Sequence, residues 1–413
     1  MKMYYLKLSF YIIKYLNIFF LLLLLKFLNC LTFTQLILIY LIYCIYVELT
    51  NKTKLYYTKN DKNNKILSLC PDILNPNFKP HFLFPFAFQQ NIICSSKYIM
   101  SDKSSIDLEF REDKVNNYGL TLYWPYFKDM KEFQNQDSPI LMILPGMTGD
   151  CTDPYIRNIS TASLKKGYHV CVYQMRSLNE NFGVDESQKF TYKNDIDMTL
   201  DHIRHNKKYG NAKIYAIGYS FGANNLVYYL GDINSTFPKE NKKISAAISI
   251  SNPYDMKLCE RLCENNIISP LVSMLERKNT RKIINSMKNC KNIKNYDFER
   301  LLSCDDVKEF DEIFSAKFHG LQTADEYYRF ISACERMKLV DVPVLCINSN
   351  DDPITPKQAI AYDEVKTNSN IFLIVTDRGS HMSFISNEKF TQFKQWHLKL
   401  MFQFFNAVNT LSK

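Results

Sequence analysis

The fold of this chain is decided by residues 214–226, which read Ile214-Tyr215-Ala216-Ile217-Gly218-Tyr219-Ser220-Phe221-Gly222-Ala223-Asn224-Asn225-Leu226. An apolar run that favours a β-strand leads into Gly-x-Ser-x-Gly, and a helical pattern follows, which is the setting of a nucleophile elbow. The serine of such an elbow lies on a strained turn, where side chains two residues before and after it would collide with the neighbouring strand and helix. We therefore predict that Ser220 is a nucleophile and that Gly218 and Gly222 are required by the elbow.

Glycine is scarce in this chain, which makes each glycine more informative about the backbone. There are 11 glycines in 413 residues, against a usual share of about 7%. Two of them, Gly146 and Gly149, lie in the loop Pro145-Gly146-Met147-Thr148-Gly149, which follows an apolar run. An acyl-transfer serine needs two backbone amides to bind the developing oxyanion. We expect Phe221 to supply one of these amides and Met147 in the loop to supply the other.

An acid and a histidine should follow the nucleophile in that order. The apolar run 342–347 ends in Asn348-Ser349-Asn350-Asp351-Asp352-Pro353-Ile354-Thr355-Pro356, so two carboxylates stand where parallel sheets place functional groups. We choose Asp352, because it immediately precedes the Pro-x-x-Pro turn, and keep Asp351 as the alternative. His381 lies in a loop after the last apolar run, two residues beyond Gly379. The expected mechanism has His381 accept the proton of Ser220 while Asp352 orients the imidazole.

The strand pattern of the chain predicts an α/β fold with a mostly parallel sheet and helices on both faces. Helical patterns at 195–208 and 223–230 alternate with the apolar runs, and about 90 residues separate the runs that end at 250 and begin at 342. We interpret that connection, about 252–340, as a helical cap inserted in a catalytic domain that spans 101–405. The predicted strands are 106–110, 120–124, 140–144, 169–173, 213–217, 246–250, 342–347 and 370–375.

The net charge of +9 is concentrated at the N-terminus, where residues 1–60 contribute +6. No basic stripe with interleaved aromatic residues follows, so nucleic-acid binding is not expected. Residues 27–47 carry no formal charge and are long enough to cross a bilayer as one helix. We therefore expect an N-terminal membrane anchor within residues 1–50 and a single-pass membrane location. A hairpin of two spans and a cleaved signal peptide are the alternatives.

Residues 51–100 are polar and then rich in proline and phenylalanine, which indicates an irregular arm laid on the surface.

The 12 cysteines are spread singly, without a Cys-x-x-Cys pair and without histidines at the spacing of zinc ligands. The sequence therefore predicts no metal site and no cofactor, and the cysteines are interpreted as packing residues.

These features resemble AB-hydrolase family 4, the YheT-like membrane-anchored α/β-hydrolases with an esterase and monoacylglycerol lipase branch. The resemblance spans about residues 100–400 and rests on four pieces in the family's order, namely 218–224 continuing to Tyr229-Leu230-Gly231, Phe310-Asp311-Glu312, Asp325-Glu326-Tyr327-Tyr328-Arg329 and Asn350-Asp351-Asp352-Pro353. It implies the α/β-hydrolase fold and a triad of Ser220, Asp352 and His381. Many members have His-Gly where this chain has Pro145-Gly146, a difference that leaves the backbone donors in place.

The expected function is that of a membrane-anchored serine hydrolase that cleaves acylglycerols or related lipid esters through an acyl-enzyme. The expected partners are a lipid or small acyl-ester substrate and a membrane. An acyltransferase, thioesterase or phospholipase acting with the same triad is the alternative. A hydrolase fold without catalysis, serving as a receptor, is the hypothesis from another class, and it would predict a broken triad.

Overall fold

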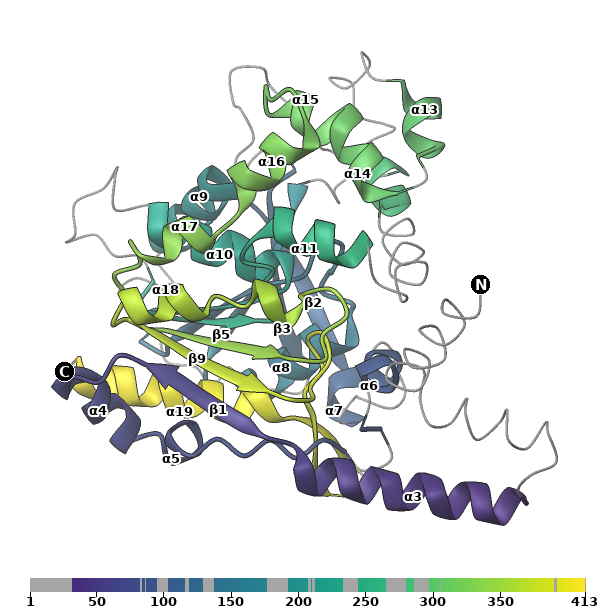
Figure 1. Cartoon of the computed structure of the whole chain (residues 1–413). Helices are drawn as coiled ribbons and strands as arrows, with labels where there is room; N and C mark the ends of the chain where they lie inside the picture. Colours follow the sequence, from purple (N-terminus) through teal and green to yellow (C-terminus); the bar gives the residue numbers. More distant parts are fainter. Residues whose placement is uncertain are drawn as a thin grey trace.

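The computed structural model of the chain describes residues 32–81, 84–85, 87–94, 103–115, 119–128, 137–176, 192–206, 209, 212–232, 244–264, 280–285, 297–304, 306–389 and 392–412. A nine-stranded sheet runs through the middle of this region, with helices on both of its faces (Figure 1). Its strand order is β1-β9-β8-β7-β6-β4-β5-β3-β2.

Six central strands of the sheet are parallel, and the three outer strands pair antiparallel with their neighbours. The parallel strands are β4 (Ile140–Leu144), β5 (His169–Gln174), β6 (Ile214–Tyr219), β7 (Ala246–Ile250), β8 (Val344–Ser349) and β9 (Ile371–Thr376), and the antiparallel ones are β1 (Thr53–Tyr57), β2 (Leu108–Lys114) and β3 (Thr121–Phe127). This is the α/β-hydrolase arrangement that the sequence predicted. The largest shift from the expected strands is at 106–110, where the helical turn α7 (Lys103–Ile106) precedes β2.

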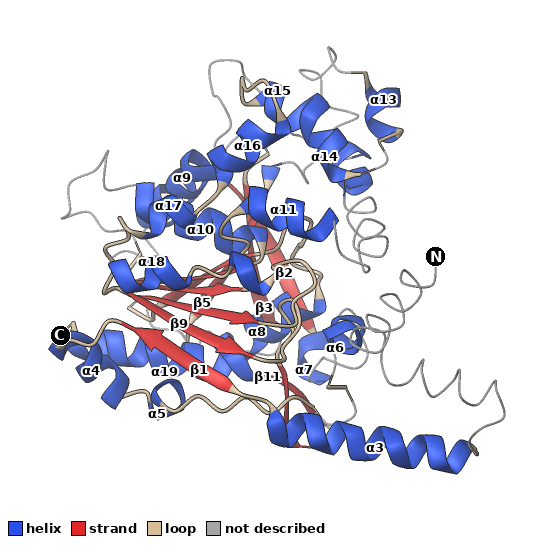
Figure 2. Cartoon of the chain, in the orientation of Figure 1, coloured by secondary structure: helices blue, strands red, loops and turns tan. Residues whose placement is uncertain are grey.

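The strands alternate side chains between two hydrophobic cores, one on each face of the sheet. Within β4, Ile140, Met142 and Leu144 pack into one core, whereas Leu141 and Ile143 pack into the other. The first core is covered by α9 (Tyr192–His205), α10 (Phe221–Asp232) and α18 (Tyr362–Thr367), and the second by α8 (Pro154–Lys165) and α19 (Trp396–Leu411). Figure 2 shows the red strands enclosed between these blue helices. The predicted site residues lie at the ends of the central strands, between these two layers.

The segment predicted to be an irregular arm is more ordered than expected. It contains β1, which pairs with β9, and the helices α4 (Asp61–Ser68), α5 (Pro71–Leu74) and α6 (Ala87–Cys94). Its apolar side chains Ile66, Ile73 and Phe78 are at most 2% exposed. The expectation was wrong because β1 is an edge strand that is only partly buried and begins with Thr53 and Lys54, so it lacks the continuous apolar run of the central strands. Its partner strand lies about 320 residues away, so no local pattern reveals the pairing.

The connection between β7 and β8 is helical where the structure describes it, as predicted for a cap. It has a small core of its own, formed by Ile284, Leu301, Cys304, Phe310 and Phe314. Residues 265–279 of the predicted cap lie outside the described residues. The cap elements are α11 (Met256–Glu264), a helical turn at 280–285, α13 (Phe298–Leu302), α14 (Val307–Phe310), the π-helical turn Asp311–Ser315, α15 (Ala316–Phe318), α16 (Ala324–Ile331) and α17 (Cys334–Met337).

The remaining elements follow the sheet towards the C-terminus. A 3-10 turn at Lys357–Ala359 precedes α18, and the hairpin of β10 (Ile385–Lys389) and β11 (Gln392–Gln395) lies between β9 and α19. The hairpin carries the chain from the loop after β9 back to α19, which packs under the sheet. The loop that contains His381 is therefore fixed at both ends.

Helix α3 (Phe33–Thr50) covers the described part of the predicted membrane span. Cys44 and Val47 are buried against the protein, whereas large apolar side chains on the rest of the helix are exposed, from 36% for Ile39 to 76% for Leu49. None of the helices among the described residues has both the length and the apolar character needed to cross a membrane. The transmembrane helix predicted at 27–47 is therefore not found, and residues 1–31, where the prediction begins, lie outside the described region.

His397 of α19 gives the fold a pH dependence that can be measured. Its ring is fully buried with Nε2 2.9 Å from the Tyr219 hydroxyl, and burial lowers the pKa of His397 to about 3. Below pH 6.5 the unfolded chain takes up a proton at this position while the folded chain does not, so stability falls with falling pH. We expect wild type to lose about 3 kcal/mol more than His397→Gln between pH 7.5 and 4.5, measured by urea unfolding. Equal losses in the two proteins would contradict this prediction.

Candidate active site

Ser220 lies on the sharp turn between β6 and α10, in the strained backbone expected of an elbow. Its φ angle is +52°, a left-handed value that non-glycine residues rarely adopt. The turn is held because the Ser220 amide donates to the Ile250 carbonyl at 2.8 Å and the Asn224 amide donates back to the Ser220 carbonyl at 3.0 Å. Position 218 requires glycine, because a Cβ there would lie only 2.5 Å from the Cα of Ala223. The serine hydroxyl is thereby presented at the carboxyl edge of the sheet.

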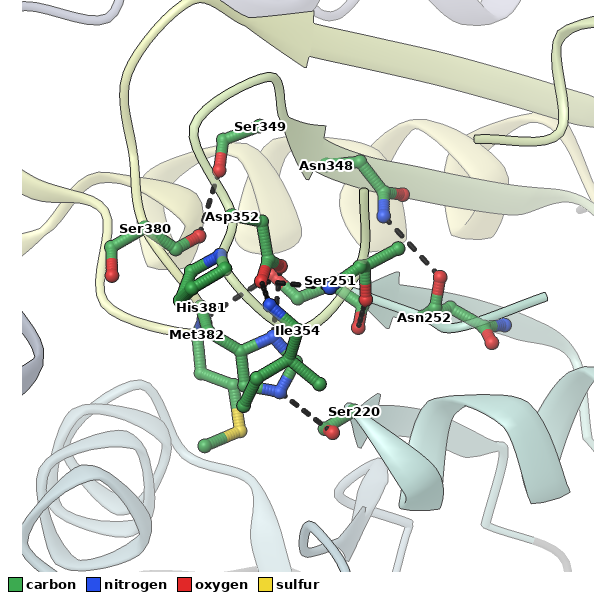
Figure 3. A network of polar contacts seen from close by, with 12 residues as sticks. Ser220, Ser251, Asn252, Asn348, Ser349, Asp352, Ile354, Ser380, His381 and Met382 are labelled. Carbon is green, nitrogen blue, oxygen red and sulfur yellow. Dashed lines mark hydrogen bonds and ion pairs between the residues drawn. The ribbon is translucent and has the colours of Figure 1, made fainter. Parts of the chain in front are cut away.

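The structure brings the three predicted residues Ser220, His381 and Asp352 together (Figure 3). His381 Nε2 lies 2.7 Å from Ser220 Oγ, and His381 Nδ1 lies 2.8 Å from Asp352 Oδ2. With the proton on Nδ1, the imidazole donates to the carboxylate and can accept the proton of the serine. All three side chains are less than 10% exposed, so the chain of hydrogen bonds is shielded from water.

Asp352 is held by more than the histidine. Its Oδ1 accepts hydrogen bonds from the amides of Ile354 at 2.8 Å and Thr355 at 3.0 Å. One carboxylate oxygen is therefore fixed by the backbone of the Pro-x-x-Pro turn, and the other is left for His381. Asp352, at the start of that turn, is therefore held where its second oxygen can accept a hydrogen bond from the imidazole.

Asp351, the alternative acid, has a different role. Its Oδ1 accepts a hydrogen bond from the Ser380 amide at 2.9 Å, so it contacts the backbone beside His381 rather than the ring. Burial raises the pKa of Asp351 to about 6, although the nearby charge of Arg378 opposes the shift. Asp351 therefore contacts the backbone of the loop, whereas Asp352 contacts the imidazole of His381.

Substitution of these two acids is expected to separate their roles. Asp352→Asn should lower kcat by about 10⁴-fold, because an amide no longer orients the imidazole or stabilises its cation. Asp351→Asn should cost less than about tenfold, because the amide oxygen can still accept from Ser380. Steady-state kinetics on one ester substrate would check both values. A greater loss in Asp351→Asn than in Asp352→Asn would contradict the assignment.

The predicted oxyanion loop lies beside the serine. A Cβ at Gly146 would lie 3.6 Å from the Cβ of Ser220, and the Gly146 amide donates to the Tyr155 hydroxyl at 3.1 Å. Gly149 closes the turn by donating to the Gly146 carbonyl at 2.9 Å. The loop that carries Met147 is therefore fixed next to the nucleophile, and the donor roles of Met147 and Phe221 stay predictions.

Two elements of the cap contact the loops of the site. Lys282 Nζ donates to the Thr148 carbonyl at 2.9 Å and lies 2.9 Å from a carboxylate oxygen of Asp150. On α11, Cys263 Sγ donates to the carbonyls of Pro353 and Ile354, in the turn that follows Asp352. The cap is thus attached on one side to the predicted oxyanion loop and on the other to the turn that follows Asp352.

Sequence reasoning missed the residues that support the site from a distance. Tyr155 of α8 holds Gly146, and the hydroxyl of Ser251 accepts a hydrogen bond from the Met382 amide at 3.2 Å. Ser251 follows β7 as Ser220 follows β6, so its place at the carboxyl end of a parallel strand was a usable signal. Tyr155 carries no such signal. Among the described residues, no three side chains of His, Cys, Asp or Glu are arranged to hold a metal ion.

The sequence of this chain is similar to those of several known lipid hydrolases. Phospholipase ABHD3 of Homo sapiens is 29% identical over 248 residues, which cover 60% of this chain and 59% of that protein. Monoacylglycerol lipase of Saccharomyces cerevisiae is 26% identical over 290 residues, which cover 66% of this chain and 61% of the lipase. The chain therefore spans about three fifths of the length of these relatives.

A solved structure, the esterase Pf2001 of Pyrococcus furiosus, covers 69% of this chain and 87% of its own chain, with a TM-score of 0.42 and 16% identity. Residues 117–366 match a family described as "Protein of unknown function (DUF1749)". That region includes the predicted oxyanion loop, the elbow and both aspartates, and it covers more than half of the chain. The chain belongs to the DUF1749 family.

Proposed function

We propose that this protein hydrolyses carboxylic esters of lipids with Ser220 as nucleophile, His381 as general base and Asp352 as its orienting acid. The observation that carries the proposal is the buried series of contacts from Ser220 Oγ to His381 Nε2 at 2.7 Å and from His381 Nδ1 to Asp352 Oδ2 at 2.8 Å. A hydrogen bond of this length lets the serine lose its proton as it attacks a carbonyl carbon.

The proposed reaction proceeds in two steps. The oxygen of Ser220 bonds to the ester carbonyl carbon while its proton passes to His381, and the amides of Phe221 and Met147 stabilise the resulting oxyanion. The ester C–O bond then breaks, and His381 returns the proton to the leaving alcohol. Water repeats the sequence on the acyl-enzyme, which releases a carboxylic acid and restores Ser220. Asp352 remains ionised and stabilises the imidazolium in both steps.

The names of the relatives support a lipid ester as substrate, since one is a phospholipase and another a monoacylglycerol lipase. The cap contacts at Thr148 and at Pro353 support it further, because a cap fastened to both loops of the site can cover an acyl chain and exclude water. The finer assignment to the membrane-anchored AB-hydrolase family 4 is part of the proposal and rests on the order of its motifs in this chain.

The proposal includes attachment of the N-terminal region to a membrane. It is supported by the exposed apolar side chains of α3, among them Leu38, Ile42 and Leu49, and by the excess of lysines in residues 1–60. Exposed apolar side chains on neighbouring turns of one helix mark a surface that contacts a membrane or a protein, and lysines beside them favour an anionic lipid surface. The full chain should float with lipid vesicles in a density gradient, and recovery with the soluble fraction would contradict attachment.

The purified full chain should be incubated with a monoacylglycerol, a phospholipid and an acyl thioester, with and without added ethanol, and the products identified by mass spectrometry. The proposal expects free fatty acid from at least one of the two lipid esters. Fatty acid ethyl ester as the main product would instead favour the acyltransferase alternative. If the protein is folded and all substrates remain intact in every incubation, the proposal is contradicted.

A further inference from the structure

The loop that carries His381 has a strained backbone at alternate residues. Ser380, Met382 and Phe384 have φ angles of +63°, +67° and +44°, left-handed values that are unfavourable for residues with a side chain. Such a backbone persists only when the surrounding structure determines it. The contacts that hold this loop therefore also determine where the imidazole of His381 stands.

Part of the support comes from the ends of the central strands. Asp351 accepts from the Ser380 amide at 2.9 Å, and the hydroxyl of Ser349 donates to the Ser380 carbonyl at 2.7 Å. The hydroxyl of Ser251 accepts from the Met382 amide. These contacts hold the backbone on both sides of His381 and do not involve the side-chain hydroxyls of Ser380 and Ser383.

Partners of these two hydroxyls lie on α6, which belongs to the N-terminal segment and not to the catalytic region predicted at 101–405. Ser380 Oγ lies 2.7 Å from both the Ala87 carbonyl and Asn91 Oδ1. Ser383 Oγ lies 3.1 Å from the same Asn91 oxygen. Asn91 Oδ1 is thus within hydrogen-bond distance of the hydroxyls of Ser380 and Ser383, and it shares them with the carbonyls of Ala87 and His381 respectively, the latter at 3.3 Å from Ser383 Oγ.

The same segment reaches further along the loop. Gln90 Oε1 accepts from the Ile385 amide at 3.1 Å, and the His81 amide donates to the Ile385 carbonyl at 3.0 Å. Helix α6 is itself fastened to α3, because Gln89 Nε2 donates to the Tyr40 hydroxyl at 2.7 Å. It can therefore act as a support and does not merely rest on the loop.

We propose that α6 positions the catalytic histidine and that Asn91 is the positioning residue at its centre. The proposal rests on the proposed function, in which His381 must accept the proton of Ser220 across 2.7 Å. Without the Asn91 oxygen, the strained backbone at Ser380 and Met382 can relax and carry the imidazole away from Ser220. A displacement of about 1 Å in a reacting group can cost about 10²-fold in rate.

The test uses Asn91→Leu, which has a side chain of the same branching without an acceptor, and Ser380→Ala, which removes the same hydrogen bond from the loop. Both should lower kcat by about 10–10² fold with KM unchanged. The double variant should lose less than the product of the two single losses, because both changes break the contact between Asn91 and Ser380. Asn91→Leu also removes the contact with Ser383, and Ser380→Ala also removes the contact with the Ala87 carbonyl. The matched control is Asn64→Leu, at an exposed position of α4, which should retain the wild-type kcat.

Hydrogen exchange measured by mass spectrometry on the peptide around residues 379–386 separates this proposal from the proposed function. Exchange should be about tenfold faster in Asn91→Leu and Ser380→Ala than in wild type and Asn64→Leu. Unchanged exchange in both variants, or losses in kcat that multiply in the double variant, would overturn the role of Asn91. Faster exchange in a protein that cleaves no ester would contradict only the proposed function and leave the structural support established.

Discussion

Replacement of Ser220 by alanine is expected to lower kcat for ester hydrolysis by about 10⁴–10⁶ fold, because the acyl-enzyme can no longer form. Only binding and the oxyanion donors would remain to accelerate the attack of water. The fold should be unaffected, since alanine fits the same turn and loses only a hydroxyl that is 2.7 Å from His381. Steady-state kinetics together with a thermal unfolding curve would check both parts of the prediction.

A second buried serine provides the control for this experiment. Ser160 is fully buried on α8 in the layer beneath the sheet, so Ser160→Ala makes the same chemical change outside the site. It should retain kcat within about twofold, because surrounding residues and the triad geometry are unchanged. Activity in Ser220→Ala that equals that of Ser160→Ala would show that the hydrolysis does not depend on Ser220.

Gly222→Ala is expected to prevent folding or to cost more than about 3 kcal/mol of stability, beyond the usual range for overpacking. A Cβ at this position would lie 2.1 Å from the Pro145 carbonyl oxygen and 2.4 Å from that of Leu144. Both obstacles are backbone atoms of β4 and of the loop that follows it, so no side-chain rotation can relieve them. Soluble yield and urea unfolding would measure the effect.

The control for Gly222→Ala is Gly167→Ala. Gly167 has a φ of +83°, and a Cβ added there would have no atom within 4 Å. It should cost only about 1–2 kcal/mol, the penalty for a left-handed alanine. The comparison separates backbone strain from collision. If Gly222→Ala were no more damaging than Gly167→Ala, the close packing of the elbow against β4 would be refuted.

The parts of the site that the sequence predicted are those that local patterns encode. Gly218, Ser220 and Gly222 lie within five residues of one another, and their spacing by itself specifies a strained turn between a strand and a helix. Asp352 and His381 were found because the ends of parallel strands gather at one edge of a sheet, so their order along the chain implied their proximity. The central strands were found for the same reason, since buried parallel strands are continuous apolar runs.

The supports of the site could not be predicted, because they depend on contacts between distant parts of the chain. Asn91 meets Ser380 across 289 residues, and nothing in the sequence near either residue indicates the other. Tyr155 supports Gly146 through a hydroxyl that could equally have faced solvent. β1 was missed because it is only partly buried at the edge of the sheet, so Thr53 and Lys54 stand where a central strand has apolar residues. The positions of these supports are determined by tertiary packing and not by local sequence.

The most direct test of the proposed hydrolase is labelling of the folded full chain with a fluorophosphonate, which phosphonylates an activated serine hydroxyl. Digestion and mass spectrometry should place the label on Ser220, and Ser220→Ala should take up none. Asp352→Asn should react far more slowly, because the imidazole that activates the serine is no longer oriented. A folded protein that never reacts, or that is labelled elsewhere with Ser220 unmodified, would contradict the assignment of Ser220 as the nucleophile.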